Sequence, residues 1–154
     1  MNKLELCVLC DDEAVSEKFV KEHGLSILIK LPNGHRWLFD TGTTDAFMEN
    51  ANIMGERLDN LDGIMISHGH DDHGGGLTFY PRLGGEPTVF GHPLIWVKQY
   101  QIKTGEPLRI CGIPYLARRY ASPHFKPLHN VTQLDDAMYF FTDVEQAPGS
   151  YCPT

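Results

Sequence analysis

Residues 64–76, IMISHGHDDHGGG, decide how this chain is interpreted. A short apolar run that is typical of a buried strand ends at Ser67, and three histidines and two aspartates follow within residues 68–73. Imidazole and carboxylate groups together suit a divalent cation such as zinc, iron or manganese. The stretch therefore predicts a metal site at the end of a strand, with Asp71 as the member that faces away from it.

The spacing within the loop has a mechanical interpretation. Gly69 allows a sharp turn, so His68 and His70 can both face one ion. Asp72 and His73 stand at the head of the next segment and can reach a second ion. Paired ions in two-metal sites lie about 3.5–4 Å apart, which one short loop can serve.

The loop resembles the signature of the metallo-β-lactamase superfamily, His-x-His-x-Asp-His after a short apolar strand. Further stretches, in order along the chain, resemble its branch of metal-dependent hydrolases that includes dihydropterin–ribofuranosyl-aminobenzene phosphate synthase-like proteins. The resemblance covers most of residues 3–143 and implies an α/β fold, the αββα sandwich, of which this chain supplies largely the N-terminal half. The stretches that carry it are EHGLS at 22–26, LFDTG at 38–42, NA at 50–51 and GHP at 91–93.

The resemblance implies a role for each site residue. His68 and His70 would hold the first ion, and Asp72 and His73 the second. Asp72 would also be catalytic, since it would orient the attacking water. Asp40 would hydrogen-bond a ligating histidine from behind and set its tautomer. The implied cofactor is a divalent metal, with zinc favoured over iron or manganese, and up to two ions once the site is complete.

The chain departs from the family where it stops, at Thr154. The part of the family domain beyond this point normally brings further histidines and a bridging acid, so the site in this chain alone is expected to be incomplete. Beyond the GHP stretch at 91–93, the only histidines are His124 and His129, which are candidates for extra ligands. They lie in a Pro-broken loop, where an exposed, non-ligating histidine is the favoured interpretation.

Composition limits the remaining possibilities. At 154 residues the chain is one domain, expected as a partial metallo-β-lactamase-like domain over residues 1–143 with a flexible tail over 144–154. The net charge of −7 argues against nucleic acid or an anionic membrane as partner. No apolar run approaches the ~20 residues of a membrane helix, and no signal peptide is visible. The expected compartment is the cytoplasm. Cys7 and Cys10 form a Cys-x-x-Cys match, but a structural place in a strand is favoured over zinc or redox chemistry.

Periodicity and turn residues predict the elements. A Pro-Asn-Gly turn at 32–34 predicts a hairpin. Thr43 or Thr44 is expected to cap a helix that carries Phe47. A second helix is expected over 93–102 and a short irregular or helical piece over 77–83, whereas residues 103–130 could not be assigned. The expected strands are 4–9, 25–31, 35–39, 64–67, 88–90 and 138–142.

Three functions are compatible with these observations. The leading one is a metal-dependent hydrolase that uses a metal-activated water on a small ester, phosphoester or pterin-related substrate. The second is a non-catalytic, truncated or split domain that acts through assembly or weak metal binding. A half-sandwich would leave an apolar face uncovered, so a homodimer, or a partner chain that supplies the missing half, is expected. A remote third is a dimeric aspartic protease using Asp40, because LFDTG also resembles that signature.

Overall fold

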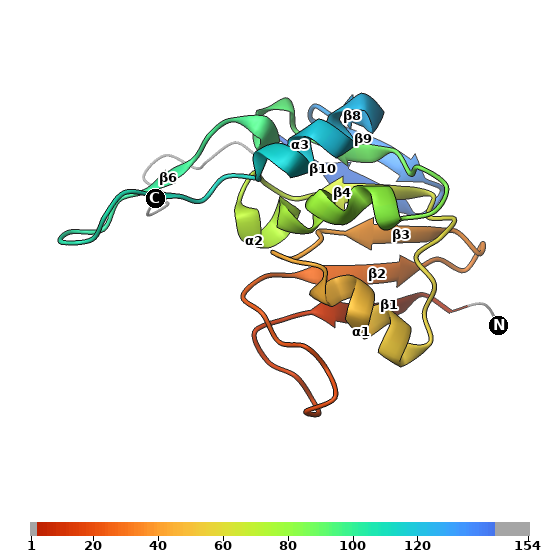
Figure 1. Ribbon diagram of the computed structural model, residues 1–154. Helices are drawn as coiled ribbons and strands as arrows, with labels where there is room; N and C mark the ends of the chain where they lie inside the picture. Colours follow the sequence, from red (N-terminus) through yellow and green to blue (C-terminus); the bar gives the residue numbers. More distant parts are fainter. Residues whose placement is uncertain (1–2, 144–154) are drawn as a thin grey trace, which may run out of the picture.

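The computed structural model describes residues 3–143, which form a mixed α/β arrangement around one six-stranded sheet (Figure 1). The strand order in this sheet is β1-β2-β3-β4-β5-β8, and two further pairs, β9-β10 and β6-β7, lie outside it. The strands are β1 (Glu5–Cys10), β2 (Ser26–Lys30), β3 (Arg36–Phe39), β4 (Gly63–Ile66), β5 (Val89–Gly91), β6 (Tyr100–Gln101), β7 (Arg109–Ile110), β8 (Phe125–Pro127), β9 (Val131–Asp135) and β10 (Met138–Phe141). The helices are α1 (Ala46–Met54), α2 (Asp71–Gly74) and α3 (Tyr115–Ala121), with 3-10 turns η1 (Gly75–Arg82), η2 (Pro93–Trp96) and η3 (Ser122–His124).

The first three strands form an antiparallel meander. Strands β2 and β3 pair through Ile29 and Trp37, and the turn between them closes with the Leu31 amide donating to the His35 carbonyl at 2.9 Å. The hairpin that the Pro-Asn-Gly turn predicts is therefore present. Alternating burial along β2 follows from the two faces of a strand, one of which contributes Leu28 to the core that also contains Phe47 of α1.

Strands β3, β4, β5 and β8 run parallel to one another. Parallel strands end at the same edge of a sheet, and ligand sites in α/β proteins gather at that edge. Asp40 follows β3, His68 follows β4, His92 follows β5 and His129 follows β8. Residues that are far apart in sequence are thus brought to one side of the molecule.

The sheet buries a core on each face. The larger core lies under α1, η1 and α3, which cover the same face in Figure 1, and includes Leu38, Ile64 and Phe47. The smaller core lies under the β9-β10 hairpin, where Phe140 packs with Trp37 and other buried residues. Helices on one face and β-structure on the other match the expected α/β class.

The smaller core does not extend to β1. Leu6 pairs with Ile29 and Val8 pairs with Ile27, so these side chains share the face on which the hairpin packs. Leu6 and Val8 nevertheless remain 61% and 51% exposed, and Leu4 beside them is 57% exposed. Among the described residues, this part of the sheet is an open apolar surface.

Two expected helix boundaries were wrong. The helix expected over 93–102 is a single 3-10 turn, η2, followed by an extended segment in which the Gln99 carbonyl accepts from the Cys111 amide. Helix α1 begins at Ala46 with Asp45 in the N-cap position, later than expected, and the Thr44 hydroxyl accepts from the Ala46 amide at 3.3 Å while it also donates to Glu22. The unassigned region 103–130 contains β7, α3, η3 and β8.

The three cysteines within residues 3–143 form no disulfide. Cys7, Cys10 and Cys111 are free thiols, and a bulge in β1 between Val8 and Cys10 lets both Cys7 and Cys10 contact the larger core. Burial raises the pKa of the Cys10 thiol, and its Sγ lies 3.3 Å from a Glu22 oxygen. The thiol of Cys10 is therefore an unreactive core group.

The remaining sequence expectations concern the tail and membranes. The tail expected at 144–154, which includes Cys152, lies outside the described residues. None of the described helices is long and apolar enough to cross a membrane.

Candidate metal centre

The histidine-rich loop is a tight connection between β4 and α2. A Cβ atom at Gly69 would lie 2.5 Å from the Ile95 carbonyl oxygen, so only glycine fits where the loop passes the η2 turn. The loop is also fastened by its backbone: the Ile113 amide donates to the Gly69 carbonyl at 3.1 Å, and the Asp71 amide donates to the Cys111 carbonyl at 2.8 Å. The positions of the side chains on this loop are consequently well defined.

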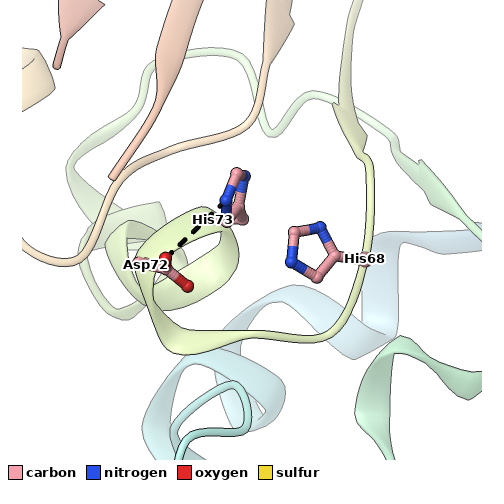
Figure 2. Close-up of side chains that lie close together, drawn as sticks. All are labelled: His68, Asp72 and His73. Atoms are coloured by element: carbon pink, nitrogen blue, oxygen red, sulfur yellow. Dashed lines mark ion pairs between the residues drawn. The ribbon is translucent and has the colours of Figure 1, made fainter. Parts of the chain in front are cut away.

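Three side chains of the loop converge. His68, Asp72 and His73 each offer one ligand atom, and these atoms all lie within 4.8 Å of one another. Figure 2 shows the two imidazole rings and the carboxylate around the turn between β4 and α2. The ring centroids of His68 and His73 are 4.2 Å apart, and His73 Nε2 lies 3.7 Å from Asp72 Oδ2.

A buried carboxylate stands behind this group. Asp40 is fully buried at the end of β3, in a left-handed conformation with φ of 54°. Its Oδ2 accepts a hydrogen bond from His73 Nδ1 at 2.8 Å, and its Oδ1 accepts one from the Ser67 amide at 2.8 Å. Because His73 donates through Nδ1, the lone pair of its Nε2 is free to bind a cation.

The same carboxylate sets the tautomer of His68 through one intermediate. The Ser67 hydroxyl donates its single proton to Asp40 Oδ2 at 2.7 Å, so its oxygen can only accept from His68 Nδ1, 2.9 Å away. His68 therefore also carries its proton on Nδ1 and presents Nε2. One aspartate thus orients both imidazole rings so that each presents Nε2.

The protonation of the two rings differs. The hydrogen bond to Asp40 raises the pKa of His73 above the ordinary histidine value. Burial lowers the pKa of His68, and the neighbouring His73 and His70 lower it further. The lowered pKa favours the neutral, metal-binding form of His68, whereas His73 takes up a proton more readily as the pH falls and must release it before its Nε2 can bind a metal.

His70 and Asp71, the remaining polar residues of the loop, lie outside the group formed by His68, Asp72 and His73. The His70 ring packs edge-on against His68, with centroids 4.6 Å apart, but His70 offers no ligand atom within the 4.8 Å group. Its role as a ligand stays a prediction. Asp71 forms an ion pair with Arg109 at 2.9 Å, in line with the expectation that it faces away.

The late histidines do not join the loop. His124 lies against the ring of Tyr80, with centroids 5.1 Å apart. His129 instead meets His92 and Asp143 in a second group whose ligand atoms lie within 4.8 Å of one another. His92 Nδ1 accepts from the Leu94 amide, so Nε2 carries the proton and donates to Asp143 Oδ1 at 2.9 Å. This tautomer makes the second group a hydrogen-bonded clasp between β5 and the end of β10.

Beside the loop lies a shallow pocket of about 200 Å³. His23, from the EHGLS stretch, enters it with Nε2 3.3 Å from Asp72 Oδ2. In the sequence, the EHGLS stretch at 22–26 is a family-like motif, but nothing in its spacing predicts that His23 lies next to residues 68–73. The pocket is lined by Asp11, Asp12, His23, Gly24, Leu25, Asp72 and His73.

The donor set of His68, Asp72 and His73 fits a divalent cation. Two imidazole lone pairs and one carboxylate are the chemistry that zinc accepts, and iron and manganese accept it too. The carboxylate hydrogen bond on the far side of His73 is the usual support of a ligating histidine. Three protein ligands with an open position are typical of catalytic zinc.

Comparison with known families agrees with this geometry. A family model described as the metallo-beta-lactamase superfamily matches residues 21–103, more than half of the chain. That range contains the hairpin, the Asp40 turn, the histidine loop and the His23 segment. The resemblance seen in the sequence is confirmed.

Two curated relatives match shorter parts of the chain. A 7,8-dihydropterin-6-methyl-4-(beta-D-ribofuranosyl)-aminobenzene-5'-phosphate synthase of Methanocaldococcus jannaschii is 33% identical over 102 residues, 62% of this chain and 35% of its own length. An anti-Pycsar protein, Apyc1, of Bacillus phage 010DV004 is 39% identical over 74 residues, 48% of this chain and 27% of its own. The chain thus spans about a third or less of the length of these relatives.

Solved structures confirm the fold. Tm1679, described as a metal-dependent hydrolase of the beta-lactamase superfamily, superposes with a TM-score of 0.68 at 30% identity and covers 89% of this chain and 47% of its own. Rm3 metallo-beta-lactamase, at 19% identity, has a TM-score of 0.50 over 77% of this chain and 44% of its own. The expected fold class is confirmed.

Replacing Asp40 by asparagine should destabilise the protein. The Asp40→Asn side chain keeps the size but turns an amide donor toward the donors of Ser67 and His73, leaving buried groups unpaired. We expect a loss of roughly 1–3 kcal/mol in the free energy of unfolding, measured by urea denaturation. The control, Asp59→Asn, removes an exposed pair with Arg57 and should change stability little. Equal stability of both variants would contradict the role given to Asp40.

Proposed function

We propose that this chain, which belongs to the metallo-beta-lactamase superfamily, holds a divalent metal ion on its histidine loop and acts as a metal-dependent hydrolase. One observation carries the proposal: His68, Asp72 and His73 converge, and Asp40 turns the lone pairs of both rings toward the same place. A structural role alone would not require two histidines with matched tautomers beside a partly exposed carboxylate.

Each residue has a definite task in the proposed reaction. A bound divalent ion supplies Lewis acidity, which acidifies a water to a pKa of about 7 and polarises a carbonyl or phosphoryl oxygen. His68 and His73 hold the ion through Nε2. Asp72 contributes a carboxylate oxygen and orients the attacking water. Asp40 keeps both rings in place, and His70 would join His68 at the first of up to two ions.

The chemistry of the donors favours zinc, with iron or manganese as alternatives. Nitrogen-rich sites with one carboxylate are typical of zinc, whereas manganese prefers more oxygen ligands. The three described cysteines are free, which agrees with a reducing compartment, and we propose the cytoplasm. The net charge of −7 makes nucleic acid and anionic membranes poor partners.

We propose a small ester, phosphoester or pterin-related molecule as the substrate class. The relative from Methanocaldococcus jannaschii carries a pterin and a ribose phosphate in the name of its product, and this supports the class without identifying a substrate. The pocket beside Asp72 is open to solvent and lies next to the metal loop, where a small molecule could enter.

The aspartic-protease alternative finds no support in the structure. That chemistry needs two carboxylates that share a proton across a two-fold axis. Asp40 has no exposed surface, and its oxygens already accept from Ser67 and His73. The Asp-Thr-Gly turn serves the histidine loop instead, since Thr41 also donates its amide to the His73 carbonyl at 2.8 Å.

Assembly remains the second proposal, and the open face of β1 favours it. Leu4, Leu6 and Val8 form a row of apolar side chains that residues 3–143 leave more than half exposed. Exposed patches of this kind mark association surfaces. We propose that a second copy of the chain covers the row as a homodimer, or that a partner chain supplying the missing half does so.

Metal binding should depend on the convergent histidines. His68→Ala and His73→Ala, and the double variant His68→Ala with His70→Ala, should lose bound zinc, iron or manganese, because each removes ligands from the loop. Metal content is measured by elemental analysis of purified protein, with His35→Ala as the control because His35 lies elsewhere and pairs with Asp135. Unchanged metal content in the loop variants would contradict the proposed function.

Metal affinity should fall as the pH is lowered. The raised pKa of His73 means that protons compete for this ring at a higher pH than for an ordinary histidine, whereas His68, with its lowered pKa, stays neutral. Calorimetric titration with Zn²⁺ between pH 8 and pH 5.5 should show binding that weakens steadily on acidification. Affinity that is constant over this range, or that rises toward acid, would argue against His73 as a ligand.

Self-association should depend on the apolar row of β1. The pair of substitutions Leu6→Lys and Val8→Lys should convert a dimer into a monomer, because charges would then face the partner surface. Light scattering at micromolar protein concentration measures the mass of each form. Leu94→Lys, at an equally exposed apolar position on η2, is the control and should leave the mass unchanged. A stable wild-type monomer would refute the homodimer.

A further inference from the structure

Two imidazole rings from distant parts of the chain point at the same carboxylate oxygen. His73 Nε2 lies 3.7 Å from Asp72 Oδ2, and His23 Nε2 lies 3.3 Å from that same atom. His73 belongs to α2, whereas His23 belongs to the loop between β1 and β2. The two rings therefore meet at Asp72 only in the folded chain.

Each of these rings is oriented by its own aspartate. His73 Nδ1 is bonded to Asp40 Oδ2 at 2.8 Å, and His23 Nδ1 lies 2.9 Å from Asp12 Oδ1. An aspartate behind one ring nitrogen, with the other nitrogen turned toward the site, is the arrangement found at metal-ligating histidines. The Asp12–His23 pair thus resembles the Asp40–His73 pair, and both rings face Asp72.

The backbone holds the His23 segment against the metal loop. The Leu25 amide donates to the Asp72 carbonyl at 3.2 Å, and the Thr43 hydroxyl donates to the His23 carbonyl at 2.7 Å. A Cβ atom at Gly24, whose φ is +148°, would lie 2.4 Å from the Asp72 carbonyl oxygen. The glycine thus permits a close approach that fixes where His23 stands relative to Asp72.

The surroundings suit a cation. The pocket of about 200 Å³ is lined by His23 and His73 together with carboxylates, and no lysine or arginine contributes to its lining. His23 Nε2 and His73 Nε2 both face the same Asp72 oxygen, at 3.3 Å and 3.7 Å. A cation placed among these three atoms would be attracted by the carboxylate and could accept a lone pair from each ring.

We infer that His23 is a further metal ligand of this chain, with Asp12 as the residue that positions it, and that it binds the ion held by Asp72 and His73. The inference rests on the proposed function and extends it to a residue outside the histidine loop. His23 would add a donor from outside the loop to the group of His68, Asp72 and His73, next to the Asp72 oxygen that its Nε2 faces at 3.3 Å.

The test uses the full chain and two metals, Zn²⁺ and Co²⁺. Zn²⁺ affinity is measured by competition with a chromophoric chelator, and the visible absorption of bound Co²⁺ reports changes in its ligands. His23→Ala should weaken Zn²⁺ binding by at least about tenfold, and Asp12→Asn, which removes only the support of the ring, should weaken it by roughly tenfold. Both should alter the Co²⁺ spectrum.

The control is a second exposed histidine that also bonds a carboxylate. His35 Nδ1 lies 2.6 Å from Asp135 Oδ2, outside the pocket, so His35→Ala removes the same kind of pair and should leave affinity and spectrum unchanged. The His23 side chain is 77% exposed, so its removal should not disturb folding, and circular dichroism checks this. His23→Gln, which keeps a polar side chain, serves as the second variant.

The outcomes separate this inference from the proposed function. If wild type binds Zn²⁺ and His73→Ala abolishes binding, while both His23 variants keep the wild-type affinity and spectrum, then His23 forms an ordinary ion pair with Asp72 and the inference is overturned. The proposed function would survive that result. If wild-type protein binds neither metal, the proposed function fails and the inference fails with it.

Discussion

The buried carboxylate of Asp40 is the constraint on which the rest of the site depends. A carboxylate without exposed surface is tolerated only when donors surround it. The donors here come from Ser67 and His73, so the end of β3, the end of β4 and the start of α2 must meet at one point. The stability of the fold and the orientation of the candidate metal ligands therefore rest on the same contacts.

The parallel strands of the sheet place Asp40 and the candidate site residues at one edge of the sheet. Because β3, β4, β5 and β8 run in the same direction, the residues that follow them lie side by side. Two of these positions build the candidate metal centre, whereas His92 and His129 build a clasp with Asp143. The tautomer of His92 distinguishes the clasp from a metal site, although the residue types alone would suit either.

The open face of β1 and the pocket beside Asp72 both involve the N-terminal segment. Strand β1 exposes Leu6 and Val8 on the face where the hairpin covers the neighbouring strands. The loop that follows β1 brings His23 Nε2 to 3.3 Å from Asp72 Oδ2 in the histidine-rich loop. One segment thus offers both an association surface and a candidate ligand, so assembly and metal binding need not exclude each other.

The sequence alone determined the features that rest on local chemistry. The apolar run before Ser67, the turn at Gly69 and the Pro-Asn-Gly hairpin were all predictable, because side-chain periodicity and turn conformation act over a few residues. The superfamily and the histidine loop followed from the same stretches. The tertiary structure decided the rest, since the helix expected over 93–102 yields to contacts with the loop and with Cys111. The partners of Asp40, the exclusion of His70 from the close group and the approach of His23 depend on residues tens of positions apart, and only packing and hydrogen bonding in the folded chain bring them together.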